Sequence, residues 1–448
     1  MAKSTRKTTD AVGRMVVELK KQGVEFVRFE TPDLHGVGRS KLIPIERVEH
    51  YARAGLNMYG GVLALDTASS VVPGALYNEQ VNYADQRLVP DLDTLAPVPW
   101  LDRTWRLICD GQWENGTWLE ASPRRIVRRL LAELDRLGYV AEMAHEFEFY
   151  IFDRETQKPL FPGVHIFNNT RNEMLPIVRE LMNHLRAAGL EMMTANVEYS
   201  PSQYELVYRH APGMKALDNA FTFKNAVKEI VTRAGLNATF MSKPAADIAG
   251  SGAHFHISLL DKKTGKNAML EKGAVNHMSA LTRYFVQGLM DHGRGAMALF
   301  APTPNCYHRL RPHTFAPSNI SWGVEDRSAM VRVKYAGEPS MHVENRVPSG
   351  LANPYLTAVG TLACALLGLK EKRPLQPSSG GPSEENPNLP RFPGSLEDSL
   401  AALEADKPLR ALLGEEFVSV FGVVKRYELA RFRGHITDWE RNEYLDVY

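Results

Sequence analysis

The segment YVAEMAHEFEFYIF (residues 139–152) contains the pattern that decides the fold of the larger part of the chain. Residues i and i+2 of a strand share a face. In HEFEF (145–149), Glu146 and Glu148 therefore point one way, and Phe147 and Phe149 point to the opposite side. We expect the phenylalanines in a hydrophobic core. Taken alone, the pattern also fits a half-exposed strand whose charges are solvated.

Three further segments carry charged or imidazole side chains at matching positions of expected strand ends. They are Glu198 and Glu205 around YSPSQY, His254 and His256 in GSGAHFHIS, and Glu344 and Arg346 in HVENRVPSG. If these strands are neighbours, their carboxylates converge on one cavity, where like charges require a counter-charge. Carboxylate oxygens with one imidazole suit magnesium or manganese better than zinc. The pattern therefore predicts a divalent-cation site.

A cluster of arginines indicates an anionic substrate. Five of them fall within forty residues, in segments rich in Pro, Ser and Asn: Arg309, Arg311, Arg327, Arg332 and Arg346. The guanidinium fork matches carboxylates and phosphates bidentately. Together with divalent cations and the backbone of Gly250-Ser251-Gly252, these arginines suggest phosphoryl transfer from a nucleotide. The chain has no GxxxxGK[ST] motif, which excludes a P-loop enzyme.

The composition is that of a globular enzyme and excludes several other classes. Of 448 residues, 44% are hydrophobic and 23% charged, and 53 Lys and Arg against 52 Asp and Glu leave a net charge of +1. This balance argues against nucleic acid or a membrane as the main partner. The uncharged stretch 347–369 contains prolines and a glycine, so we interpret it as a loop leading into a buried helix.

The number and spacing of the cysteines indicate the cellular compartment of the protein. Cys109, Cys306 and Cys364 are an odd number without a CxxC pair, so neither disulfides nor a structural zinc site are expected. No apolar run of signal-peptide length follows the basic start. A cytoplasmic location is therefore expected.

The order of patterns predicts two domains, over residues 1–118 and 119–448. Short β-rich runs, VEFVRFE (24–30) and GVLALD (61–66), characterise the first domain. From Ser122-Pro123, apolar residues recur at helical spacing until Gly138. Two helix–glycine–strand junctions follow, at 179–199 and 223–244, and favour an α+β or α/β catalytic domain. The proline-rich stretch 373–395 is expected to be an exposed loop, with amphipathic helices after it.

In joint order and spacing, the motifs resemble those of the glutamine synthetase superfamily, from about residue 20 to the C-terminus. They are EFEF (146–149), EYSPSQYE (198–205), KPAADIAGSGAHFHIS (243–258), NCYHRLRPHTFAP (305–317), RSAMVRV (327–333) and ENRVPSGLANPYL (344–356). The resemblance implies an α+β fold with a small N-terminal β-grasp domain and a larger catalytic domain. In the latter, a curved antiparallel sheet flanked by helices forms a funnel-like site. It also implies two chemical steps: ATP phosphorylates the γ-carboxylate of glutamate, and an amine then displaces phosphate.

The resemblance also implies roles for individual residues. Two or three Mg²⁺ or Mn²⁺ ions would be bound by Glu148, Glu198 and Glu205 beside glutamate, and by Glu146, His254 and Glu344 beside the ATP phosphates. Glutamate would be held by Gly250, Arg309 and Arg346 next to Glu148, and the nucleotide by His256, Ser258 and Arg332. Arg327 would stabilise the transferring phosphoryl group. Asp66 stands where an aspartate lines the amine site of an adjacent subunit. A homo-oligomer of two stacked hexameric rings, a dodecamer, is therefore expected.

The chain departs from the family in the flap segment. Ammonia-using members carry a glutamate two residues before an Ala-Pro pair, whereas here His313-Thr314-Phe315-Ala316-Pro317 places Phe315 or a close neighbour there. A buried aromatic ring would contribute on the order of 1.5–3 kcal/mol to binding an organic amine. We therefore expect a glutamate–amine ligase that makes a γ-glutamylamide. The alternatives are an ordinary glutamine synthetase that uses ammonia, an inactive structural relative, and a ligase for another carboxylate.

Overall fold

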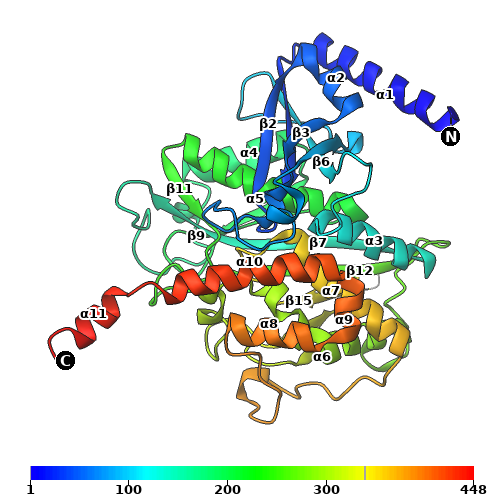
Figure 1. Cartoon of the computed structure of the whole chain (residues 1–448). Coiled ribbons are helices and arrows are strands. Elements are labelled where there is room, and N and C mark those ends of the chain that lie inside the picture. Colours follow the sequence, from blue (N-terminus) through cyan, green and yellow to red (C-terminus); the bar gives the residue numbers. More distant parts are fainter. Residues whose placement is uncertain (1, 336, 338–339) are drawn as a thin grey trace.

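The computed structural model describes residues 2–335, 337 and 340–448, and it is a mixed α+β structure built around two sheets (Figure 1). The first hundred residues form the upper part of the molecule in this view, and the helices that end the chain lie in the lower part. Within the described residues, no helix is long and apolar enough to cross a membrane. The three cysteines are free and buried.

The N-terminal part contains a six-stranded sheet in the order β2-β1-β6-β4-β3, with β5 paired to β6. Its strands are β1 (Phe26–Pro32), β2 (Gly38–Pro44), β3 (Leu56–Tyr59), β4 (Asp85–Pro90), β5 (Ala96–Pro97) and β6 (Thr104–Gln112). The helices α1 (Ala2–Lys21) and α2 (Ile45–Ala54) complete this part. The strand expected in VEFVRFE is confirmed as β1. The β-grasp assignment and the boundary at residue 118 stay predictions.

The expected β-run in GVLALD is wrong, because residues Gly60–Ala64 form a buried 3₁₀ helix instead. A Cβ atom at Gly60 would lie 2.7 Å from the ring of Trp113, and one at Gly61 would lie 2.3 Å from that of Tyr59. Because both positions are glycine, the chain can form a turn that packs closely against these aromatic rings. Local β-propensity does not predict such a turn.

The second sheet has nine strands and carries the motifs singled out above. Its order is β13-β14-β15-β12-β7-β9-β8, with β10 and β11 paired to β7. The strands are β7 (Tyr139–Asp153), β8 (Met192–Val197), β9 (Gln203–Tyr208), β10 (Ala211–Pro212), β11 (Leu236–Thr239), β12 (Ala253–Asp261), β13 (Trp322–Val324), β14 (Val331–Lys334) and β15 (His342–Asn345). The expected antiparallel arrangement holds except that β13 and β14 are parallel.

Helices cover this sheet and extend to the C-terminus. They are α3 (Pro123–Arg136), α4 (Pro176–Ala187), α5 (Gly213–Arg233), α6 (Ala280–Phe300), α7 (Pro354–Glu371), α8 (Leu396–Ala405), α9 (Lys407–Leu413), α10 (Glu415–Arg433) and α11 (Asp438–Tyr444). The helix expected after Ser122 is confirmed as α3, and Gly138 beyond it has the left-handed φ of 89°. The buried helix expected near 347–369 is confirmed as α7. Its Gly368 meets Gly288 of α6, where a Cβ would lie 2.1 Å from a backbone oxygen.

The predicted alternation in HEFEF is confirmed. Phe147 and Phe149 of β7 are fully buried and pack with Phe223 of α5, whose ring centroid lies 5.5 Å from that of Phe147. Glu146 remains partly exposed on the other side of the sheet. This packing fixes which face of β7 carries the carboxylates.

A buried arginine joins the two parts of the molecule. Arg124, at the start of α3, is fully buried, and its guanidinium donates to Asp218 of α5 at 2.8 and 2.9 Å. It also donates to Asp110 of β6 at 2.8 Å and to Asp91, which follows β4, at 2.7 Å. One guanidinium therefore compensates carboxylates from the N-terminal sheet and from helix α5 of the larger part.

We predict that Arg124→Met destabilises the protein, because the substitution leaves several partly or fully buried carboxylates without their cation. The expected loss in the free energy of unfolding is about 3–5 kcal/mol, measured by chemical denaturation followed by tryptophan fluorescence. The matched control is Arg136→Met at the exposed end of the same helix, which should change stability by less than about 0.5 kcal/mol. Equal effects of the two substitutions would contradict the role given to Arg124.

Candidate active site

The strand register brings the predicted residues together on one face of the second sheet. Glu148 of β7 lies opposite Glu205 of β9, and Glu146 of β7 lies opposite His254 of β12. On the next strand, Glu344 of β15 lies opposite His256 of β12. Directly opposed residues of an antiparallel pair project from the same face. Four strands that are distant in sequence therefore contribute to a single cluster.

The centre of the cluster consists of histidines and carboxylates in close contact. The Nδ1 atom of His254 lies 3.4 Å from Oε1 of Glu146 and 3.5 Å from Oε1 of Glu344. The Nε2 atom of His256 lies 3.5 Å from Oε2 of Glu146. His254 is buried, and its other ring nitrogen, Nε2, has no hydrogen-bond partner among the described residues.

Negative charge accumulates at the end of the cluster formed by β7 and β9. Burial, followed by repulsion from Glu146, Glu148 and Glu198, raises the pKa of Glu205 to about 10. Burial and the charge of Glu148 also raise the pKa of Glu198 to about 7. These carboxylates resist simultaneous ionisation, because like charges in a desolvated site repel strongly. A cation bound among these carboxylates would offset their mutual repulsion.

Arginines border the opposite end of the cluster. Arg346 forms an ion pair with Glu344, and Nη1 of Arg332 lies 3.2 Å from Oε2 of the same carboxylate. Burial alone would favour the neutral acid, but the neighbouring His256, His254 and Arg346 hold the pKa of Glu344 at about 2. Glu344 is therefore ionised at neutral pH, and Arg346 can present only part of its donor set to a ligand.

The glycine segment 250–252 is packed directly against a buried arginine. A Cβ atom at Gly250 would lie 2.7 Å from Cγ of Arg309, and one at Gly252 would lie 2.7 Å from its Nη2 atom. Arg309 donates to the carbonyl oxygens of Val347 at 3.0 Å and Arg346 at 3.2 Å. Glycine is required at position 250, where a Cβ would also lie 2.9 Å from the carbonyl oxygen of Ser242, whereas at position 252 the nearest atom is the end of the Arg309 side chain. The backbone N–H of Gly252 also donates to Oε2 of Glu148 at 2.8 Å.

The flap carries Phe315 to the edge of this cluster. The Phe315 ring is 68% exposed, and its centroid lies 5.0 Å from that of Tyr199 at an interplanar angle of 54°. Tyr199 follows Glu198 directly in the chain, so the pair connects the flap to the acidic end of the site. Sequence reasoning did not single out Tyr199, and only its position beside a predicted ligand could have drawn attention to it.

Some predicted residues have other partners or lie away from the cluster. The carboxylate of Asp66 is fully buried, accepts hydrogen bonds from the backbone of Ala68 and Ser70, and pairs with Arg431 of α10. Its expected place in a neighbour's amine site stays a prediction. Ser258 donates to the carbonyl oxygen of Met341 at 3.1 Å. The side chain of Arg327 is exposed, and its carbonyl accepts from Nε of Arg346 at 2.9 Å.

The tightest group of possible metal ligands in the described part of the chain lies outside the predicted set. Ligand atoms of His313, Glu384 and Glu385 lie within 4.8 Å of one another. The backbone N–H of His313 already donates to Oε2 of Glu384 at 2.8 Å, which ties the flap to the 383–385 turn. The predicted ligands are spread over a wider area, as pairs across neighbouring strands.

Comparisons with known proteins identify the family of the chain. The family model for the catalytic domain of glutamine synthetase matches residues 120–444. A glutamate–isopropylamine ligase from Pseudomonas sp. is 30% identical over 96% of both chains. A glutamine synthetase from Thermus thermophilus is 32% identical over 96% of this chain and 98% of its own. The solved structure of apo GmaS superposes with a TM-score of 0.85 at 28% identity, covering 95% of this chain and 98% of that one.

The family model covers most of the chain, and relatives align with nearly its whole length. This chain belongs to the glutamine synthetase family.

Proposed function

We propose that the protein is an ATP-dependent ligase that joins the γ-carboxylate of glutamate to an organic primary amine, giving a γ-glutamylamide, ADP and phosphate. The observation that carries the proposal is the aromatic pair of Phe315 and Tyr199 beside the acidic cluster. Overall similarity does not decide between amines, since a glutamate–isopropylamine ligase and a glutamine synthetase match almost equally well. A γ-glutamylanilide synthase from Acinetobacter sp., 29% identical over 99% of this chain, also supports an organic amine.

The cluster fits hard divalent cations. Its donors are carboxylate oxygens and one imidazole, the set that Mg²⁺ and Mn²⁺ accept, and Nε2 of buried His254 has no other partner among the described residues. Glu148, Glu198 and Glu205 would hold the metal beside glutamate, and Glu146, His254 and Glu344 the metal beside the ATP phosphates. When bound, the cations would supply the positive charge that neutralises phosphate and acyl-phosphate oxygens.

The remaining residues would position the two substrates. Glutamate would contact Gly250, Arg309 and Arg346, while His256, Ser258 and Arg332 would contact the nucleotide. Arg309 is held by two backbone carbonyls, so its guanidinium is pre-oriented and costs little entropy to use. Arg327 is exposed and has room to follow the transferring phosphoryl group.

Two displacement steps account for the products. An oxygen of the γ-carboxylate attacks the γ-phosphorus of ATP, and the bond to ADP breaks. The amine nitrogen then attacks the activated acyl carbon, the bond to phosphate breaks, and the nitrogen loses a proton. An apolar rim of Phe315 and Tyr199 favours an amine with a hydrocarbon part that arrives neutral, because such a surface cannot replace the solvation of an ammonium ion.

The alternatives make different demands on the site. Ordinary glutamine synthesis would need a second acid near the flap to bind ammonium, and Phe315 does not supply one. An inactive structural relative would be expected to lose metal ligands, yet all six predicted positions retain Glu or His.

Asp66 would serve the amine step only in a neighbouring subunit of a ring-shaped homo-oligomer, since within its own chain it is buried against Arg431.

Replacing Glu205 by glutamine is predicted to lower kcat at least about 100-fold, because a neutral amide cannot complete the cation's coordination shell. Phosphate release with glutamate, ATP, Mg²⁺ and isopropylamine measures the loss. Calorimetric titration with Mn²⁺ should show weaker binding in the same variant. Glu191→Gln, at an exposed ion pair with Arg209, serves as the control. Wild-type turnover and Mn²⁺ affinity in Glu205→Gln would remove Glu205 from the site.

Phe315→Glu is predicted to shift kcat/KM from organic amines toward ammonia by at least about tenfold, because the apolar contact is replaced by a carboxylate. A panel of ammonia, isopropylamine, ethanolamine and aniline measures the ratio. Phe315→Leu retains apolar surface and should keep the wild-type order. If the wild type itself prefers ammonia to every organic amine tested, the protein is a glutamine synthetase.

Mixing two inactive variants tests whether Asp66 acts in a neighbouring subunit. Asp66→Asn and Glu205→Gln should each be inactive as homo-oligomers. After co-refolding or co-expression, some hybrid sites would combine an intact Glu205 with a neighbour's intact Asp66, so activity should reappear. Absence of complementation in assemblies shown by mass spectrometry to contain both variants would place Asp66 outside the shared site.

A further inference from the structure

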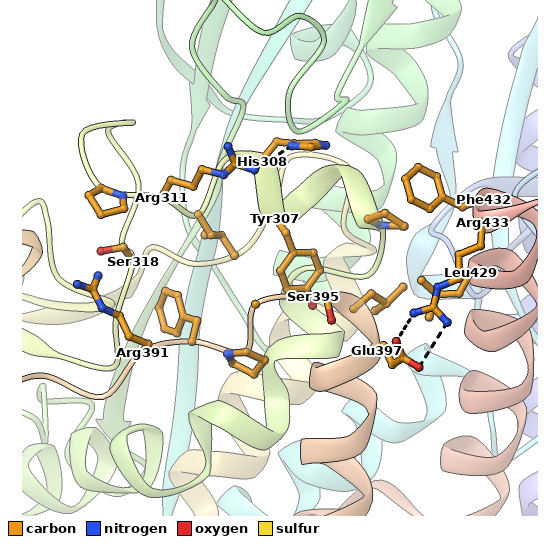
Figure 2. Close-up of a pocket in the computed structure, with 17 residues that line it drawn as sticks. Tyr307, His308, Arg311, Ser318, Arg391, Ser395, Glu397, Leu429, Phe432 and Arg433 are labelled. Atoms are coloured by element: carbon orange, nitrogen blue, oxygen red, sulfur yellow. Dashed lines mark hydrogen bonds and ion pairs between the residues drawn. The ribbon is translucent and has the colours of Figure 1, made fainter. Parts of the chain in front are cut away.

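A cavity lies beside the two ends of the flap loop. Its volume is about 480 Å³, within the range of small-molecule sites. Three segments line it: the chain from Pro304 to Ser318, the chain from Arg391 to Glu397, and the end of α10 from Leu429 to Arg433 (Figure 2). Arg309 is not among the lining residues, since it turns inward toward the glycine segment.

One end of this cavity is cationic. In Figure 2, Arg311, Ser318 and Arg391 lie at one end, and Leu429, Phe432 and Arg433 lie at the other, with Tyr307 between them. Arg311 contacts His308 at 3.4 Å, and in the described part of the chain neither Arg311 nor Arg391 forms an ion pair with a carboxylate. The Oγ atom of Ser318 is buried and lacks a hydrogen-bond partner among the described residues.

The only acid that lines the cavity in the described structure is Glu397, and Arg433 already neutralises it. At the first end, Arg391 lies near Ser318, whose hydroxyl has no partner among the described residues, while the guanidinium of Arg311 turns toward His308 (Figure 2). Such a combination favours a carboxylate or phosphate, which accepts hydrogen bonds from arginine and serine together.

The rest of the lining is apolar and partly open. It includes Leu310, Phe392, Leu396, Leu429 and Phe432. Phe432 is 57% exposed, although a large aromatic ring gains free energy when it is covered. A ligand with a ring or branched hydrocarbon would cover part of this surface while its anionic group meets Arg391.

We propose that this cavity is a binding site for small organic anions that combine one carboxylate or phosphate with an apolar ring or branched chain. The anionic group would lie beside Arg391 and Ser318, and the apolar part against Tyr307. This assignment goes beyond the ligase reaction and does not depend on it.

The location links the cavity to the flap. Leu310, Arg311 and Pro312 begin the loop that carries Phe315, and Ser318 ends it, so both ends of the loop line the cavity. A ligand that contacts both ends restricts the backbone between them. Occupancy would thus be felt at Phe315, within the loop.

Phenyl phosphate is a suitable probe, because it contains both chemical parts. Isothermal titration calorimetry should show that it binds at least about tenfold more tightly than inorganic phosphate or phenol alone. Equal affinity for phenyl phosphate and inorganic phosphate would overturn the proposal, as would absence of binding.

Two variants locate the bound probe. Arg391→Gln should weaken phenyl phosphate binding about tenfold through the lost charge, and Tyr307→Ala should weaken it through the lost ring contact. The control is Arg154→Gln, an exposed arginine in the turn after β7, which should leave binding unchanged. If neither cavity variant affects affinity, the probe binds elsewhere and the assignment is wrong.

Hydrogen exchange separately tests the link to the flap. Saturating phenyl phosphate should slow amide exchange in residues 310–318 in the wild type, and the effect should disappear in Arg391→Gln at the same probe concentration. Binding that leaves exchange in this loop unchanged would overturn the link while leaving the site itself in place.

Discussion

Strand β7 pairs with β9 on one side and with β12 on the other. The register of these two pairings determines which side chains form the acidic cluster. It places Glu148 opposite Glu205 and Glu146 opposite His254. A slip of one residue would turn Glu146 and Glu148 into the core and Phe147 and Phe149 out of it. Such a slip is opposed by the complete burial of Phe147 and Phe149. Hydrophobic packing on one face of the sheet therefore fixes the chemistry on the other.

The same constraint creates an electrostatic problem that the fold resolves only in part. At the β15 end, Glu344 is balanced by Arg346, Arg332 and the histidines, and its pKa is held at about 2. At the β9 end, Glu205 has acidic neighbours, and its pKa rises to about 10. This asymmetry is typical of a binding site, because a purely structural network would place its counter-charges within the protein.

The flap connects two regions of opposite character. Phe315 contacts Tyr199 next to the carboxylates. The two ends of the loop contribute to a cavity with arginines that lack acidic partners in the described structure. The segment 383–385 also reaches the flap through Glu384 and His313. One short loop thus borders both the acidic cluster and a cationic cavity, so a change in its conformation is felt at both.

The sequence by itself determined the strand of HEFEF and its two faces, the helix after Ser122, the buried helix α7 and the residues that gather on the second sheet. The strand and the helices are local features, since periodicity and capping residues act within a few positions, whereas the gathering residues were indicated by repeated strand patterns and by the order of the motifs, which also indicated the family. Only the tertiary structure decided the partner of Asp66, the contact of Tyr199 with Phe315 and the cavity formed by three separate segments. It also replaced the expected strand in GVLALD by a 3₁₀ helix. Each of these depends on groups that are far apart in the chain and meet only when helices and sheets pack, so no local pattern encodes them.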